Sequence, residues 1–288
     1  MRLKRSLMNL AKPALLFFSL ALFLISLPAC QNPLEPTYKE KDIPSIVKKI
    51  CKEEYGLDVT TIRAHTTLWI YTPVTKLLHE EYGIKEDKIF SEEMLDKLRN
   101  ILTTVGRVLL SSDNAPEFFA IVASDINIGL DYIIIGNVLD LKKAYAGFIP
   151  EMEVNRRYVI KLAEDPKAKG DVTGSHFQAY DVRLADFLAE QMAQRIGSRF
   201  QEEGQKKFFK VEKSEGRFSD GTFILEYSIE QIAKPPKEID IKKEILDIIT
   251  YCIKTYEFRD FSQIEIADLI TQDRVILNKA SIWAKTIK

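Results

Sequence analysis

Four stretches of the sequence repeat apolar residues every three or four positions, which is the spacing of a helix with one buried face. They cover residues 43–55, 92–110, 182–203 and 241–257. Residue types that commonly cap a helix stand directly before them, at Asp42, Ser91, Asp181 and Asp240. The pattern therefore predicts four amphipathic helices.

Runs rich in β-branched and aromatic residues follow each of these helices. They cover residues 58–72, 118–124, 132–142, 208–213, 222–229, 263–270 and 274–284. The first run is typical of one long strand or of a tight pair that breaks near His65. A hairpin around Gly216 and Asp220-Gly221 joins the fourth and fifth runs. Helices thus alternate with strands along the whole chain.

This order predicts an α+β fold in which antiparallel β-hairpins pack against helices. A Cys followed four residues later by a Tyr occurs in both the first and the last predicted helix. The coincidence favours repeated αββ units, and chance similarity between two α+β segments explains it equally well. We expect an N-terminal αββ-type lobe at 42–146 and a C-terminal αββ-type lobe at 175–288. Residues 147–174 are expected to form an irregular connection, with a short helix after Pro150 and a strand at 158–162 as open alternatives.

The first thirty residues have a different pattern. Arg2, Lys4 and Arg5 precede an apolar, uncharged run from Pro13 to Leu27. A basic start followed by a short apolar run is typical of a secretory signal peptide. As a helix, the fifteen residues of this run rise only about 22 Å, less than the roughly 30 Å hydrocarbon core of a bilayer. We therefore expect residues 1–29 to be a cleaved signal peptide rather than a permanent membrane helix.

The end of this segment, Leu27-Pro28-Ala29-Cys30, resembles the lipobox of bacterial lipoproteins, although Pro28 replaces the usual Ser or Ala. The resemblance implies that Cys30 receives a diacylglyceryl thioether, that cleavage occurs before it, and that its new amino group is acylated. An ordinary signal peptide with a nearby Cys is the alternative. Several acyl chains would make the attachment to the bilayer effectively stable.

The residue after Cys30 is Gln31 rather than Asp, and the resemblance to Gram-negative lipoproteins then implies the outer membrane. Residues 30–41 contain Pro33 and Pro36, and we expect them to form a lipidated, extended tether. The implied location is the bacterial cell envelope, lipid-anchored and facing the periplasm.

The charge of the chain argues against one class of partner. The full chain has a net charge of −1, and the expected signal peptide carries basic residues only, so the remainder is mildly acidic. No basic face suggests binding to nucleic acid. Apart from Cys30, the chain contains only Cys51 and Cys252, on the apolar sides of predicted helices. They form either one disulfide bond or two separate buried thiols.

Two short motifs contain residue types that carry chemistry. Residues 125–131 offer oxygen donors at positions one, three and seven, as in a calcium loop, but lack the glycine at six and the glutamate at twelve. Ser175 and His176, with Asp181 nearby, supply the types of a hydrolytic triad, but no nucleophile elbow is present. We predict no catalytic residue, no metal ligand and no cofactor other than the lipid on Cys30.

Four aromatic residues are candidates for recognition of a partner, with burial in the core as the alternative. They are Trp69, Tyr71, Phe148 and Trp283. The anchor, the tether and the absence of a catalytic signature favour a non-enzymatic envelope lipoprotein that binds or assembles an envelope protein. A periplasmic binding module for a lipid, glycan or small ligand is the first alternative. A hydrolase with dispersed site residues is the second.

Overall fold

The computed structural model describes residues 36–78 and 89–284. The expected signal peptide, Cys30 and the first part of the expected tether lie outside these residues. No helix within 36–78 or 89–284 is long and apolar enough to cross a membrane.

The first lobe is built on a mixed five-stranded sheet with the strand order β1-β2-β3-β4-β5. Its strands are β1 (Thr60–Ala64), β2 (Thr67–Val74), β3 (Phe118–Asp125), β4 (Leu130–Asn137) and β5 (Val159–Glu164). The central pair β2 and β3 is parallel, and the other neighbours are antiparallel. Helices α2 (Ile43–Tyr55) and α3 (Glu92–Leu110) bury their apolar stripes against one face of this sheet.

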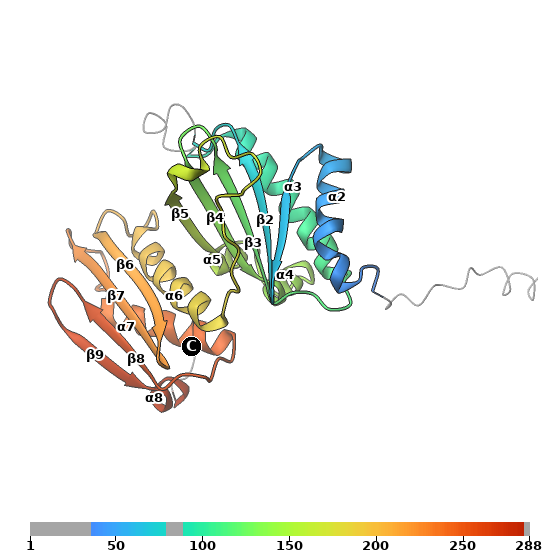
Figure 1. Ribbon diagram of the computed structural model, residues 1–288. Coiled ribbons are helices and arrows are strands. Elements are labelled where there is room, and N and C mark those ends of the chain that lie inside the picture. Colours follow the sequence, from blue (N-terminus) through green and yellow to red (C-terminus); the bar gives the residue numbers. More distant parts are fainter. Residues whose placement is uncertain (1–35, 79–88, 285–288) are drawn as a thin grey trace, which may run out of the picture.

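The second lobe repeats this plan with four strands in the order β6-β7-β8-β9. Its elements are α6 (Leu184–Gln201), β6 (Phe209–Ser219), β7 (Thr222–Gln231), α7 (Ile241–Thr255), β8 (Gln263–Asp268), β9 (Arg274–Asn278) and α8 (Lys279–Ala284). The central pair β7 and β8 is again parallel. Helices α6 and α7 contribute to one hydrophobic core with this sheet, and α6 lies between the two lobes (Figure 1).

The predicted α+β class is confirmed, and the helix–hairpin order occurs four times, beginning at α2, α3, α6 and α7. Each lobe therefore contains two αββ units. The second helix of a lobe carries the chain back across the sheet, so the third strand runs parallel to the second. Trp283 lies on α8 rather than on the strand expected at 274–284, which ends at Asn278.

One predicted strand boundary is wrong. The strand expected at 132–142 ends at Asn137, whose side chain accepts hydrogen bonds from the backbone N–H of Leu139 and Asp140 and so caps a new helix. This helix is α4 (Val138–Tyr145), and α5 (Glu151–Arg157) follows it. The open alternatives within 147–174, a short helix after Pro150 and a strand at 158–162, are both found, as α5 and the fifth strand β5.

The hairpin between β6 and β7 turns only at Asp220-Gly221, where both residues have positive φ angles of 50° and 74°. Such a pair matches the two-residue turns that fit the twist of antiparallel strands. Gly216, expected at the same turn, lies inside β6 instead. A Cβ atom there would approach the carbonyl oxygen of Ala189 in α6 to 2.0 Å, so the close approach of strand and helix requires glycine.

The last part of the expected tether is bound to the body of the first lobe. The backbone N–H groups of Thr37 and Tyr38 donate to the carbonyl oxygen of Ser111, at 2.8 and 3.0 Å. The Glu40 carboxylate, in the short 3-10 helix η1 (Glu40–Asp42), pairs with Arg63 at 2.7 Å. Only residues before Thr37 can therefore act as a free tether.

Candidate functional site

The second face of the first sheet is covered by residues 165–183, which we call the cover segment. It begins with the 3-10 helix η2 (Pro166–Ala168) and runs along the sheet to α6 (Figure 1). The indole N–H of Trp69 donates to the carbonyl oxygen of Tyr180 at 2.6 Å, and the Tyr71 hydroxyl donates to that of Asp171 at 2.5 Å. Trp69 and Tyr71 are both buried, so they hold the cover segment and are wrong as exposed recognition aromatics.

His176 belongs to the cover segment, and its side chain lies between this segment and the sheet, where it is only 2% exposed. Its Nδ1 atom is 2.8 Å from Oδ2 of Asp171, and its Nε2 atom is 3.3 Å from Oδ2 of Asp131. The ring of Tyr71 packs edge-on against the imidazole at 5.5 Å between centroids. Asp131 is on β4, so the imidazole joins the cover segment to the sheet.

Asp171 organises the loop around this histidine. Its carboxylate accepts hydrogen bonds from Thr173, Gly174, Ser175 and His176. Burial raises the pKa of Asp171, but the hydrogen bonds from His176 and Thr173 outweigh burial and hold the pKa well below its usual range. The carboxylate is therefore ionised at neutral pH and acts only as an acceptor.

Asp131, Asp165 and His176 form a group that could hold a metal ion. One potential donor atom from each residue lies within 4.8 Å of the others. Asp131 is buried, and its Oδ1 atom has no hydrogen-bond partner among the residues that the structure describes. A buried carboxylate oxygen without a partner is costly, because it has lost water and gained nothing in exchange. The sequence prediction of no metal ligand missed this group, since its members lie 34 and 11 positions apart along the chain.

The motif at 125–131 is not arranged as a calcium loop. The Asp125 carboxylate accepts hydrogen bonds from the backbone N–H groups of Leu77 and Asn127, at 2.8 and 3.0 Å, and so orders the turn between β3 and β4. Asp131 pairs with Ser124, the neighbour of Asp125. The two aspartates therefore point to opposite faces of the sheet and cannot share an ion.

The hydrolytic triad is also not assembled. The Ser175 hydroxyl donates to Asp171 rather than to His176. Asp181, expected to cap the third predicted helix, instead accepts hydrogen bonds from the hydroxyl groups of Thr66 and Thr67, where β2 begins. Because His176 lies beside Tyr71, four residues further along β2 than Thr67, these residues do not form a nucleophile–base–orienter relay.

A buried ionic network joins the two lobes. Arg157 of α5 pairs with Asp140 at 2.6 Å and with Glu153 at 2.9 Å. Arg195 of α6 and the hydroxyl of Tyr251 in α7 each donate to Glu153 at 2.6 Å. Burial raises the pKa of Glu153, but the bonds from Arg195, Tyr251 and Arg157 outweigh it and lower the pKa to about 2. The network has paired charges throughout and is better suited to fixing the lobes than to chemistry.

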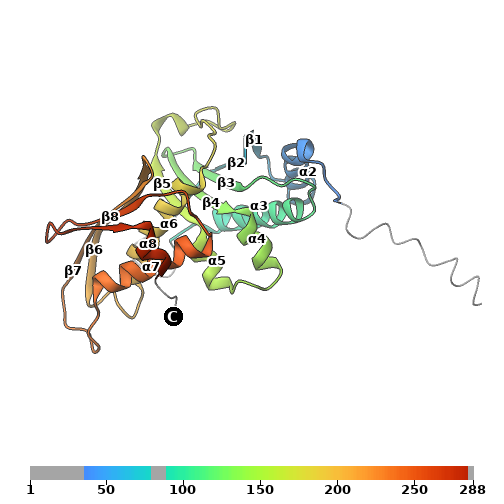
Figure 2. The same ribbon diagram turned by 90° about the horizontal axis from the view of Figure 1, so that it is seen from below.

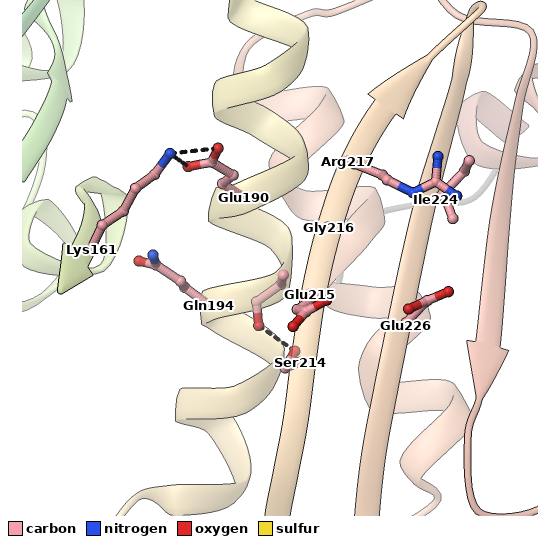
Figure 3. A pocket seen from close by; sticks show the side chains of 10 residues that line it. Lys161, Glu190, Gln194, Ser214, Glu215, Gly216, Arg217, Ile224 and Glu226 are labelled. Atoms are coloured by element: carbon pink, nitrogen blue, oxygen red, sulfur yellow. Dashed lines mark hydrogen bonds and ion pairs between the residues drawn. The ribbon is translucent and has the colours of Figure 1, made fainter. Parts of the chain in front are cut away.

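An open cavity of about 330 Å³ lies between β5, α6 and the β6–β7 hairpin (Figure 3). Lys161 of β5 and Glu190 of α6 point toward each other at 2.6 Å, and Arg217 and Glu226 line the opposite wall. The volume is at the lower end of that of ligand sites, and the charged lining suits a small polar ligand rather than a lipid tail.

The α4–α5 hairpin carries four exposed apolar side chains, and we call this part of the surface the α4–α5 knob. Its members are Leu139 (56% exposed), Tyr145 (55%), Phe148 (80%) and Met152 (75%). The hairpin projects from the first lobe beside α3 (Figure 2). Lys142 and Lys143 lie on α4 between the first two members. Phe148 is thus the most exposed of the four candidate recognition aromatics.

The remaining candidates are placed as follows. Trp283 is half-buried, with the Arg259 guanidinium 4.2 Å from its ring centre. Cys51 and Cys252 are buried, free thiols in the cores of different lobes, so the alternative of a disulfide bond between them is wrong. Each fills the apolar side of its helix, where burial raises the pKa of the Cys252 thiol to about 12.

Comparison of the chain with protein-family models, with curated proteins and with solved structures finds no match. The case for a function therefore depends on the chain's own residues. The sequence pattern points to Phe148 but not to Leu139, Tyr145 or Met152, because it predicts a strand at 132–142 and leaves the short helix after Pro150 as one open alternative. It places His176 beside Ser175 and Asp181 in the chain and does not predict the contacts of His176 with Asp171 and Asp131.

Proposed function

We propose that this protein is a lipid-anchored lipoprotein of the bacterial cell envelope that binds another envelope protein through the α4–α5 knob. The observation that carries the proposal is the exposure of Phe148, in the turn between α4 and α5, and of Met152, in the first turn of α5, at 80% and 75%. Aromatic residues and methionine are enriched at protein interfaces, where their burial supplies much of the binding energy. The protein itself performs no reaction in this proposal.

The chemistry of the knob suggests the kind of partner. Its apolar members would fill a hydrophobic groove, and methionine adapts to the shape of such a groove. Lys142 and Lys143 border the apolar group and would meet acidic residues at the rim of the groove. We therefore expect a partner with an apolar groove edged by Asp or Glu.

The proposed anchor limits where this partner lies. Within residues 36–78 and 89–284, Thr37 is the first residue hydrogen-bonded to the body of the protein, seven positions after Cys30. Seven residues span at most about 25 Å when fully extended. If Cys30 is acylated, the domain stays within this distance of the membrane surface. The lipobox resemblance and Gln31 favour the periplasmic face of the outer membrane.

The proposed binding surface is tested by placing a photo-reactive phenylalanine analogue at position 148 of the full-length protein in cells. We expect one discrete protein adduct after irradiation, and we expect Met152→Ser to remove it. The same analogue at position 276, an isoleucine that is 60% exposed on the edge strand β9, is the matched control and should give no such adduct.

The adduct alone does not establish recognition, so the captured protein must then be purified and titrated with the full-length lipoprotein. Phe148→Ser should weaken binding at least about thirtyfold, as expected for a central interface residue. Adducts with lipid only, or identical adducts at positions 148 and 276, would count against a protein partner. Cys30→Ala tests the anchor separately, and should move the protein from the membrane fraction to the aqueous fraction.

A second candidate function is the binding of a small polar ligand between the lobes. It is favoured by the cavity of about 330 Å³ and by the basic and acidic side chains that line it. Arg217→Ala and Lys161→Ala should then weaken binding of a zwitterionic or anionic ligand, measured by thermal shift across a ligand panel. This candidate is abandoned if no ligand raises the melting temperature of the wild-type protein. It is also abandoned if every ligand that does so raises the melting temperature of the variants equally.

A further inference from the structure

We propose that Asp131, Asp165 and His176 bind a divalent transition-metal ion, with Zn²⁺ as the best match, beneath the cover segment. The site is separate from the α4–α5 knob, and the two proposals can fail independently. The proposal depends on the direction of the histidine nitrogens, on one carboxylate oxygen without a partner, and on the separation between the donor atoms.

The first argument is the tautomer of His176, which follows from the contacts of Asp171. The Asp171 carboxylate already accepts hydrogen bonds from the backbone N–H groups of Thr173, Gly174 and His176 and from the Ser175 hydroxyl. Nδ1 of His176 lies 2.8 Å from this acceptor, so Nδ1 carries a proton and donates. In a neutral imidazole the Nε2 atom then carries no proton and has a free lone pair. It faces a second acceptor, Oδ2 of Asp131, at 3.3 Å. Two acceptors face each other in this way only if a proton or a metal cation lies between them.

The second argument distinguishes the metal from the proton. A proton on Nε2 would satisfy Oδ2 of Asp131, but it would leave the buried Oδ1 atom without a partner. Asp165 adds a third possible donor to the group, while its Oδ1 atom accepts a hydrogen bond from the backbone N–H of Lys167 and caps η2. A divalent cation attracts both oxygens of Asp131, includes Asp165, and balances the negative charge that the aspartates concentrate around one imidazole.

The third argument is the distance. A charge-assisted N–H···O bond is usually about 2.7–2.9 Å long. Two ligand atoms that are each about 2.05 Å from a tetrahedral Zn²⁺ lie roughly 3.3 Å apart. The observed separation of 3.3 Å between Nε2 and Oδ2 matches the metal better than the proton. Since all three donors already lie within 4.8 Å, closing the site needs side-chain shifts of at most about 1.5 Å.

The surroundings resemble those of bound metals in general. A ligating histidine usually donates its other N–H to a carboxylate, which fixes the ring, and Asp171 does this here. One imidazole with two carboxylates suits Zn²⁺ better than Ca²⁺, which prefers six or more oxygens. The ion would join β4 to both ends of the loop 165–176 and so hold the cover segment on the sheet.

The test uses the tag-free full-length protein in detergent, treated with a chelator that is then removed. Calorimetric titration with Zn²⁺ should show one saturable site per chain, and bound zinc should raise the melting temperature. Asp131→Asn and His176→Gln should each weaken Zn²⁺ binding at least a hundredfold. Asp171→Asn should weaken it about tenfold to a hundredfold, since it only orients the histidine.

The matched control is His65→Gln, which removes an exposed histidine from the β1–β2 turn and should leave the affinity unchanged. Circular dichroism of each metal-free variant checks folding. If the two buried variants do not fold, the half-buried ligand is tested by Asp165→Asn, which should also lose the site. The proposal is overturned if the folded wild-type protein has no saturable Zn²⁺ site, if it prefers Ca²⁺, or if folded ligand variants bind zinc as the wild type does.

Discussion

At the scale of single residues, Gly216 shows how one position can fix the distance between two elements. It lies in the middle of β6, where the strand passes directly over the backbone of α6. The carbonyl oxygen of Ala189 occupies the space that any side chain would need, and this oxygen cannot rotate away from its helix. Glycine is required here for close approach and not for an unusual backbone angle.

We therefore expect Gly216→Ala to lower the free energy of unfolding by about 3 kcal/mol or more, because the added methyl group must push the strand from the helix. Urea unfolding followed by fluorescence measures the loss. Gly204→Ala is the control, since a Cβ atom at that exposed position meets nothing within 4 Å and should change stability by less than about 0.5 kcal/mol. Equal losses in the two variants would contradict the close contact.

At the scale of elements, the outer edge of β5 is closed by a side chain rather than by another strand. The backbone N–H of Ile160 donates to Gln194 at 3.0 Å, and the Gln194 amide donates back to the Ile160 carbonyl at 2.5 Å. The side-chain amide presents an N–H donor and a carbonyl acceptor side by side, as a neighbouring strand would. Helix α6 thereby protects a sheet edge of the other lobe and holds the lobes together.

Gln194→Ala should remove both hydrogen bonds and lower the free energy of unfolding by about 1–2 kcal/mol. The amide hydrogens of residues 159–164 should also exchange faster with solvent, as measured by hydrogen-exchange mass spectrometry. Gln201→Ala, at the exposed end of the same helix, should change neither quantity. Unchanged exchange in β5 of the Gln194→Ala variant would show that the amide does not close this edge.

At the scale of the whole molecule, the ionic network around Glu153 makes the stability of the contact between the two lobes depend on pH. The pKa of Glu153 is about 2 in the folded protein, against an ordinary value of 4.5. A carboxylate with a lowered pKa stabilises the fold above its unfolded pKa, and this stabilisation disappears as the pH falls toward the folded pKa. Here the window extends from about pH 4.5 down to about pH 2.

Glu153→Gln should therefore cost stability of the order of 3 kcal/mol at pH 7, and this difference from the wild type should shrink as the pH falls below about 4.5. Urea unfolding at a series of pH values measures the difference. Glu54→Gln is the control, because Glu54 forms an exposed pair with Arg107 that is screened by solvent. A difference between wild type and Glu153→Gln that stays constant down to pH 2.5 would contradict the shifted pKa.

The sequence by itself determined the α+β class, the four main helices and their alternation with hairpins. These follow from periodicity and capping, which act between residues close together in the chain. Ser91 and Asp240, for example, cap α3 and α7 as expected. The prediction of lipidation at Cys30 also comes from the sequence alone, because it depends on a short motif of neighbouring residues.

Only the tertiary structure decided the features that need contacts between distant segments. It placed His176 between Asp171 and Asp131, paired α5 with α6 and α7, and assigned Trp69 and Tyr71 to the cover segment rather than to the surface. It also exposed Met152 and Phe148 on a helical hairpin. Local patterns indicate which side of an element is apolar, but the burial of a given side chain depends on which other element packs against it.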